Sequence, residues 1–224
     1  MEKTREQIMK MLQKYKVIAI LRRIPMNCFL ETADAVYRGG IRLMEVPFDQ
    51  SGELPAQTTK EQIQSLTMRY PDAAVGAGTV LYKEQVDMAR EGGASYIISP
   101  NTDKEIIAYT RKCGLISIPG ALTSTEMQNA YSWGADYVKL FPAGTFGIDY
   151  LKDIMAPLRH IKFLAVGRIN AENIGDFLKA GCTGAGVGSC LLDENMIRDG
   201  RYKELEELAG QYAAYAQSDG EDDI

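Results

Sequence analysis

The feature that most constrains the fold is a regular repeat of short apolar runs along the 224 residues. Successive runs begin 20 to 31 residues apart, and each interval fits one strand, one helix and two short loops. The runs are apolar on both faces, which is typical of parallel strands that are covered on both sides. Their first residues are Val17, Leu43, Ala74, Tyr96, Ile116, Tyr137, Lys162 and Gly184.

Eight strand–helix units predict an α/β fold, a (β/α)8 TIM barrel, with an extra N-terminal helix. That helix is indicated by the capping-box spacing of Thr4 and Gln7, and Asn27 and Asn170 are candidate N-caps of later helices. An open, doubly wound sheet is the alternative, because the number of strands alone does not show that the sheet closes.

Composition indicates one ordinary globular domain, with 46% apolar and 25% charged residues. We expect the barrel over residues 1–217 and an acidic, disordered tail over residues 218–224. A net charge of -5 with scattered cations gives no basic surface for nucleic acid. No apolar stretch approaches the roughly 20 residues of a membrane span, and the N-terminus is too polar for a signal peptide. We therefore expect a cytoplasmic protein with no nucleic-acid or membrane partner.

Cysteine and histidine usage limits the chemistry. The four cysteines form no CxxC pair, and reduced thiols are favoured over a disulfide framework or a zinc site. His160 is the only histidine, which excludes His-clustered metal sites and disfavours triad catalysis unless His160 itself takes part. We expect neither a metal nor a cofactor.

Two strands each carry one charged residue among apolar neighbours. Lys139 lies in Asp136–Pro142, and Glu45 lies in Leu43–Phe48. A buried cation is unfavourable unless it is paired or becomes neutral, and a neutral buried amine is the nucleophile that carbonyl chemistry needs. We expect both side chains to point into one shared site. The alternatives are a lysine whose ammonium reaches water at a strand end, or a structural ion pair.

The ends of the last two strands indicate an anion site. In barrels of this kind the chemistry lies at the carboxyl ends of the strands, and phosphate often binds after the seventh and eighth strands. Val166, Gly167 and Arg168 follow the seventh, and Gly188 and Ser189 follow the eighth. Glycine lets the backbone approach an anion, and Ser189 adds a hydroxyl donor.

Together these motifs resemble the class I aldolases of 2-keto-3-deoxy-6-phosphogluconate, its galactonate epimer and 4-hydroxy-2-oxoglutarate. The resemblance covers Val17 to about Leu192. The segments that carry it are Ile18–Arg22, Gly39–Pro47, Val75–Leu81 (VGAGTVL), Ile98–Asn101, Pro119–Gly120, Val138–Pro142 (VKLFP) and Gly181–Ser189.

The resemblance implies a lyase that cleaves a 2-keto-3-deoxy sugar acid to pyruvate and an aldehyde such as glyceraldehyde 3-phosphate. It implies that Lys139 forms the Schiff base and that Glu45 moves protons. It also implies that Arg22 contacts the substrate and that Thr79 and Pro100 line the pyruvate end. Phe141 is expected near the imine, although core packing is an equal explanation for Phe141 and Pro100. The family resemblance further implies a homotrimer.

Three departures bear on the substrate. Asp49 stands where the gluconate-type pattern has arginine, Val166 replaces a threonine, and Arg168 replaces a glycine. Val166 and Arg22 favour the galactonate type, and Asp49 is expected beside the substrate. The competing interpretations are a phosphate-binding isomerase or epimerase, and a ligand-binding barrel that has lost catalysis.

Overall fold

Nine parallel strands form one sheet in the computed structural model of the chain, which describes residues 3–215. Around the sheet their order is β5-β4-β3-β2-β1-β9-β8-β7-β6. Their bounds are β1 (Val17–Ile20), β2 (Leu43–Pro47), β3 (Ala74–Gly78), β4 (Tyr96–Ile98), β5 (Ile116–Ile118), β6 (Gly120–Ala121), β7 (Val138–Leu140), β8 (Phe163–Val166) and β9 (Gly184–Val187).

The sheet closes where the fifth predicted strand is divided. Pro119 separates β5, which pairs with β4, from β6, which pairs with β7. Two backbone hydrogen bonds join this divided strand to β7: Lys139 N donates to Pro119 O (2.9 Å), and Phe141 N donates to Ala121 O (3.2 Å). The predicted (β/α)8 barrel is therefore confirmed, and the open sheet is wrong. The division itself was not predicted, since the apolar run gives no sign of it.

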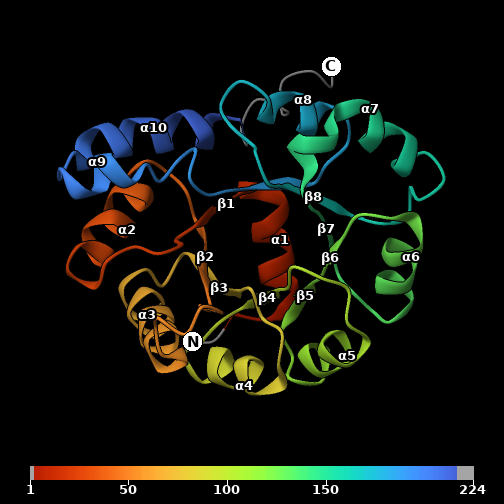
Figure 1. Cartoon of the computed structure of the whole chain (residues 1–224), viewed down its shortest axis with the longest axis horizontal. Helices are drawn as coiled ribbons and strands as arrows, with labels where there is room; N and C mark the ends of the chain where they lie inside the picture. Colours follow the sequence, from red (N-terminus) through yellow and green to blue (C-terminus); the bar gives the residue numbers. More distant parts are fainter. Residues whose placement is uncertain (1–2, 216–224) are drawn as a thin grey trace.

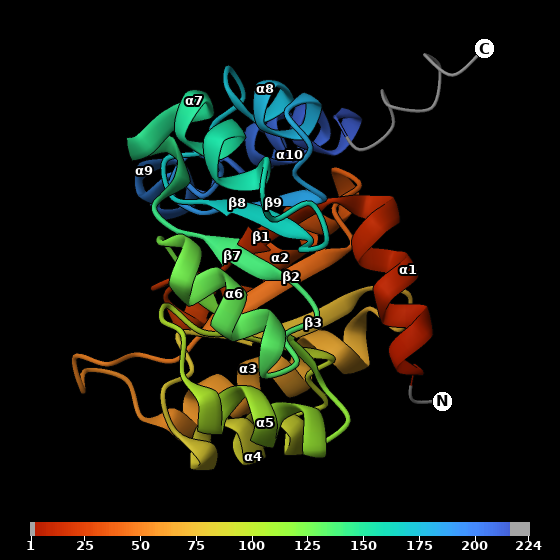
Figure 2. The same ribbon diagram turned by 90° about the vertical axis from the view of Figure 1, so that its right-hand side faces the viewer.

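Helices surround the barrel, as Figures 1 and 2 show. They follow the strands in the alternation that the repeat predicts, and two of them, α9 and α10, follow β9. Their bounds are α1 (Arg5–Tyr15), the 3-10 helix η1 (Met26–Cys28), α2 (Phe29–Arg38), α3 (Ala56–Arg69), α4 (Lys83–Glu91), α5 (Lys104–Lys112), α6 (Ser124–Ser132), α7 (Ala143–Met155), α8 (Ile174–Lys179), α9 (Glu194–Arg198) and α10 (Tyr202–Ala214).

The N-terminal helix α1 covers the amino end of the barrel. It lies over the centre of the ring in Figure 1 and at one end of the barrel in Figure 2. The predicted capping box of Thr4 and Gln7 is present at its start. Ile8 and Leu12 from α1 are buried in one cluster with side chains from the barrel interior, among them Tyr96 and Leu164. The barrel is thus closed at this end, and a ligand must enter from the other.

Both candidate N-caps are wrong as assigned. Asn27 lies inside η1, because Cys28 N donates to Pro25 O (3.0 Å) and the 3-10 turn has already begun. Asn170 caps a turn instead of helix α8: its Oδ1 accepts from Asn173 N (3.0 Å). The predicted tail, residues 218–224, lies outside the described residues, and the domain bounds stay a prediction.

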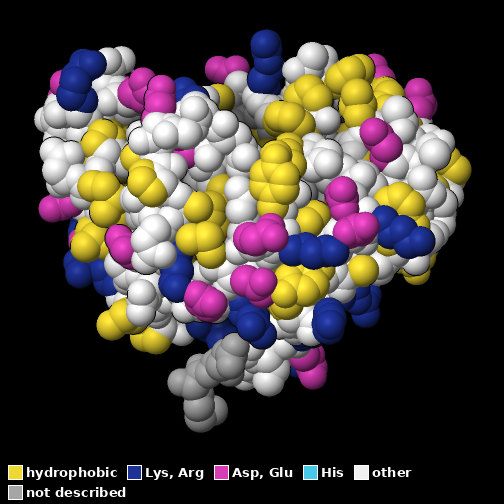
Figure 3. Space-filling model, turned by 60° about the horizontal axis from the view of Figure 1, so that its bottom comes forward, with side chains coloured by type: hydrophobic (Ala, Val, Ile, Leu, Met, Phe, Trp, Pro, Cys, Tyr) yellow, Lys and Arg dark blue, Asp and Glu magenta, His cyan; other side chains and the backbone are white. Residues whose placement is uncertain are grey.

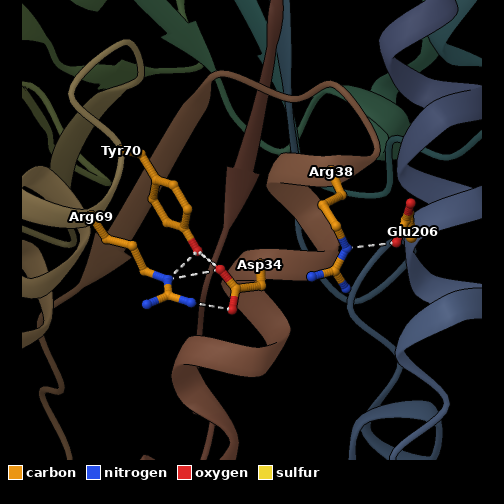
Figure 4. A network of polar contacts seen from close by, with 5 residues as sticks. All are labelled: Asp34, Arg38, Arg69, Tyr70 and Glu206. Atoms are coloured by element: carbon orange, nitrogen blue, oxygen red, sulfur yellow. Dashed lines mark hydrogen bonds and ion pairs between the residues drawn. The ribbon is translucent and has the colours of Figure 1, made fainter.

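A network of polar contacts ties α2 to its neighbours on the outside of the barrel (Figure 4). Arg69 at the end of α3 donates to both carboxylate oxygens of Asp34, at 2.8 and 2.6 Å, and Tyr70 donates to the same carboxylate. The Arg69 hydrogen bonds hold the pKa of Asp34 below its usual range. On the other side of α2, Arg38 Nε donates to Glu206 of α10 at 2.8 Å.

Charges of both signs are interspersed on the outer surface. On the face drawn in Figure 3, Lys and Arg side chains lie among Asp and Glu side chains. Within residues 3–215, none of the helices combines the length and the apolar character needed to cross a membrane.

Candidate active site

A cavity of about 590 Å³ opens at the carboxyl ends of the strands. Ten of the eleven predicted site residues line it, and Glu45 lies buried beneath them. The ten are Arg22, Thr79, Pro100, Lys139, Phe141, Val166, Gly167, Arg168, Gly188 and Ser189. The prediction missed seven further lining residues, Ile20, Arg23, Ile169, Gly186, Cys190, Leu192 and Glu194.

Lys139 projects from β7 at the inner end of this cavity. Its side chain is only 5% exposed, and its Nζ lies 4.8 Å from the centre of the Phe141 ring. Burial lowers the pKa of Lys139, the carboxylate of Glu45 partly opposes that change, and the cation of Arg22 adds to it. The ammonium does not reach water in the way that a strand-end lysine would allow.

Glu45 on β2 is buried still more deeply, at 1% exposure. Burial raises the pKa of its carboxyl, and the nearby charges of Lys139 and Arg22 oppose that rise. Its Oε1 has no hydrogen-bond partner among the described residues. Room for this carboxyl depends on Gly78, because a Cβ at that position would lie 1.7 Å from Oε1. The glycine that ends β3 therefore belongs to the site.

The strand order explains why the two charged residues meet. If β5 and β6 count as one divided strand, β2 and β7 stand four strands apart in either direction around the ring. Side chains that point inward from opposite walls of a small barrel approach each other near its axis. The mutual effects on the two pKa values agree with this placement.

Arg22 and Thr79 form one wall of the cavity. Arg22 Nη2 donates to Thr79 Oγ1 at 3.2 Å, and Gln50 Nε2 donates to Thr79 O at 3.0 Å. Thr79 has φ 54°, a left-handed conformation that is unfavourable for a β-branched residue. Gln50 was not predicted as a site residue, because it lies in the loop after β2 and outside the segments that resemble the family.

The backbone after β8 is left-handed at two successive residues, Gly167 (φ 92°) and Arg168 (φ 58°). Two hydrogen bonds hold this turn: Gly144 N donates to Gly167 O at 2.9 Å, and Asn173 Nδ2 donates to Arg168 O at 3.0 Å. The Arg168 side chain is exposed and lines the cavity.

Asp49, which was expected beside the substrate, is not among the residues that line the cavity. Its carboxylate accepts from Leu54 N (2.9 Å), Ser51 N (3.1 Å) and the Ser51 hydroxyl (2.8 Å). The Leu54 N–H and then the Ser51 hydroxyl lower the pKa of Asp49 to about 2. The following loop therefore uses this carboxylate for its own folding.

Comparison with known proteins decides the family. A family model described as KDPG and KHG aldolase matches residues 8–208. The chain belongs to this family. A relative named 2-dehydro-3-deoxy-6-phosphogalactonate aldolase, from Escherichia coli strain K12, is 35% identical over 207 residues, which are 92% of this chain and 95% of the relative. A 2-dehydro-3-deoxy-phosphogluconate aldolase from Treponema pallidum is 28% identical over 205 residues, 91% of this chain and 95% of that one.

Solved structures of KDPG and KHG aldolases have the same fold. A native KDPGal structure is 33% identical, with a TM-score of 0.78, over 90% of this chain and 94% of that one. A KDPG aldolase from Legionella pneumophila, with pyruvate captured as a covalent carbinolamine, is 27% identical, with a TM-score of 0.80, over 89% of this chain and 95% of that one. The predicted class I aldolase, a lyase, is confirmed.

Proposed function

We propose that this aldolase cleaves a 6-phosphorylated 2-keto-3-deoxy sugar acid to pyruvate and glyceraldehyde 3-phosphate, with Lys139 as the nucleophile. The observation that carries the proposal is a buried amine with a lowered pKa at the inner end of the cavity, coupled to a buried carboxyl. A lysine with the ordinary pKa of about 10.4 is only about 0.04% neutral at pH 7. Burial of Lys139 raises that fraction and makes attack on a ketone feasible.

Lys139 acts through a covalent intermediate. Its neutral Nζ attacks the C2 carbonyl of the substrate, and the resulting carbinolamine loses water to give an iminium. When the C3–C4 bond breaks, its electron pair moves to C3 and into the iminium, which becomes an enamine, and the C4 hydroxyl becomes the aldehyde. Protonation of the enamine at C3 and hydrolysis then release pyruvate and return the amine.

Glu45 serves as the acid–base group. Its raised pKa allows the carboxyl to hold a proton for the dehydration of the carbinolamine and to take the C4 hydroxyl proton during cleavage. The unpartnered Oε1 leaves one carboxyl oxygen available for that transfer, directly or through one water.

The remaining wall residues divide between the two ends of the substrate. Arg22 and Thr79 present donors to the pyruvate carboxylate, and Pro100 and Phe141 pack against the three-carbon unit. At the other end of the cavity, Val166, Gly167, Arg168, Gly188 and Ser189 hold the terminal phosphate, with N–H groups and the Ser189 hydroxyl as donors.

The galactonate epimer is the substrate that we propose. The relative from Escherichia coli named for that epimer is 35% identical to this chain, and Val166 and Arg22 favour the same type. We also propose a homotrimer that works in the cytoplasm, by resemblance to the family; light scattering on the eluted enzyme measures the first, and cell fractionation the second.

Trapping of the imine tests the mechanism. Incubation with pyruvate and borohydride should add one reduced pyruvyl group per chain, on the peptide that contains Lys139. Labelling that persists in Lys139→Met defeats the assignment. Pyruvate that raises the melting temperature without any turnover would instead favour a barrel that has lost catalysis.

A substrate panel tests the specificity. The enzyme is assayed with both epimers of the six-carbon acid, phosphorylated and unphosphorylated, and the release of pyruvate is coupled to a reporter. A higher kcat/KM for the gluconate epimer would overturn the substrate proposal and leave the mechanism in place.

A further inference from the structure

Two arginines on the cavity wall occupy backbone conformations that favour glycine. Arg23 has φ 55° and Arg168 has φ 58°. A side chain in the left-handed region is unfavourable because its Cβ approaches the backbone, and glycine avoids this cost. Residues 3–215 contain four non-glycine residues with positive φ, and three of the four, Thr79 included, line this one cavity. Because non-glycine residues in this conformation collect at functional sites, the two arginine side chains are expected to have a functional role.

The sheet order places these arginines on either side of one turn. Arg23 follows β1, Arg168 follows β8, and β9 pairs with both strands. The turn at Gly188 and Ser189, directly after β9, therefore lies between the two arginine loops. Neighbouring strands are about 4.8 Å apart, so the loops after β1 and β8 stand roughly 10 Å from each other. A small anion over the turn is within reach of a long side chain from each side.

The charge of the cavity wall is opposite to that of the whole chain. Three arginines line it, Arg22, Arg23 and Arg168, together with the amine of Lys139, against a single carboxylate, that of Glu194, whereas the chain carries -5. Arg22 is already bonded to Thr79, and Lys139 lies at the inner end. Neither the Arg23 nor the Arg168 guanidinium has a hydrogen-bond or ion-pair partner within residues 3–215. Both are free to bind a ligand.

We propose that Arg23 and Arg168 determine specificity by binding the terminal phosphate of the substrate from both sides of the Gly188–Ser189 turn. The proposal rests on the aldolase function proposed above. A phosphate dianion offers enough oxygen acceptors for two guanidinium groups together with the donors of the turn. In this proposal the phosphate is bound by backbone N–H groups of the turn and, from opposite sides, by the two arginine side chains.

Removing the charge of Glu194 should change the KM in the opposite direction to removing an arginine. Together with Arg23 it lines both this cavity and a neighbouring one of about 480 Å³, so the two side chains share the wall between them. A carboxylate there repels a phosphate that the arginines attract. Glu194→Gln should therefore lower the KM for a phosphorylated acid.

The decisive variants are Arg23→Gly and Arg168→Gly, since glycine relieves the unfavourable φ and the fold is retained. Each should raise the KM for the phosphorylated acid by roughly 10- to 100-fold, the scale for one charged hydrogen-bonding group, with little change in kcat. The KM for the unphosphorylated acid of the same carbon skeleton should stay the same. The melting temperature should not fall.

Lys16→Gly is the matched control. It removes a cation at another left-handed position, φ 53°, at the opposite end of β1. Both substrates should respond to this variant as they do to the wild type. If Arg23→Gly and Arg168→Gly lower kcat/KM equally for both acids, or leave the phosphorylated one unaffected, the proposal is wrong. A wild type with the same KM for both acids would also overturn it.

Two measurements separate this proposal from the proposed function. Labelling with pyruvate and borohydride should remain complete in both glycine variants, because they leave Lys139 untouched; if the wild type takes no label, the aldolase mechanism fails. Inorganic phosphate gives a readout without turnover. It should raise the melting temperature of the wild type and of Lys16→Gly, and raise that of the two arginine variants less. If phosphate raised the melting temperature of all four proteins equally, the phosphate contact of the two arginines would be wrong, and the aldolase mechanism would be unaffected.

Discussion

The two ends of this barrel are made from the same strands and treat charge in opposite ways. At the amino end, Arg5 pairs with Asp136, and Asp136 also accepts from Ser117 N (2.8 Å). Lys3 Nζ donates to Ala73 O at 2.8 Å. At the carboxyl end, by contrast, a buried ionisable oxygen, Oε1 of Glu45, lacks a hydrogen-bond partner within residues 3–215, whereas the buried group without one at the amino end is the uncharged hydroxyl of Tyr137.

The contrast separates the end that stabilises the fold from the end where we place the reaction. Apolar packing and satisfied charges make the amino end favourable to the fold. Buried ionisable groups and left-handed side chains make the carboxyl end unfavourable, and such features collect at functional sites. The closed end thus stabilises a barrel whose open end, where we place the reaction, carries a cost in stability.

The largest expected effect comes from Lys139→Met. Turnover should fall on the order of 10⁴-fold or more, the scale for loss of a covalent nucleophile. The melting temperature should rise, because the folded chain binds a proton at Lys139 less well than the unfolded chain does, and this opposes folding below pH 10.5. Steady-state kinetics and thermal unfolding measure the two effects. A lower melting temperature would mean that the buried pair stabilises the fold.

Truncation of a buried side chain at the amino end should instead lower stability and leave the kinetics unchanged. Leu12 of α1 is 1% exposed, and Leu12→Ala should lower the free energy of unfolding by about 2–5 kcal/mol, as is usual for a buried leucine. The KM of the folded enzyme should stay the same, since the cavity lies at the other end. Urea unfolding and kinetics at low temperature check this. A large rise in KM would show that the ends are not independent.

Glu45→Gln should lower turnover by about 10²-fold, as for loss of a general acid–base group. Its negative charge raises the pKa of Lys139 against the effect of burial. Removing the charge lowers that pKa further, and the rise of imine formation with pH should then shift to lower pH. Borohydride trapping at a series of pH values gives the profile. Near wild-type turnover, with an unshifted profile, would make Glu45 a structural partner only.

The smallest effect is expected for Arg5→Met. Its side chain is 36% exposed, so solvent screens the pair with Asp136, and the loss should be about 1 kcal/mol in the free energy of unfolding. Kinetic constants should be those of the wild type. A loss as large as that of Leu12→Ala would show that charge, and not packing, closes the amino end.

Much of the fold follows from periodicity. Six of the eight predicted strands begin at the predicted residue, and those expected at Tyr137 and Lys162 begin one residue later. Alternation along single strands also placed Glu45 and Lys139 on faces that prove to point inward. These features depend on local sequence, and local sequence is sufficient to predict them.

Features that depend on loop geometry were not predictable in the same way. Asp49 was expected at the substrate, but its carboxylate is taken up by backbone N–H groups two and five residues later. Arg23 lines the cavity from a left-handed backbone conformation, which no side-chain pattern reveals. A pair of arginines directly after the first strand was the one available signal.

The pairing of β1 with β9 has a consequence for the order of assembly. It joins the first and last strands of residues 3–215, and a contact so distant in sequence forms late because a long stretch of chain must first be brought together. The phosphate that we place over the Gly188–Ser189 turn lies on this seam. A ligand that binds the closed barrel, and not a chain in which these two strands are unpaired, stabilises the closed barrel. A phosphate bound at this turn should therefore stabilise the strand pair that forms last.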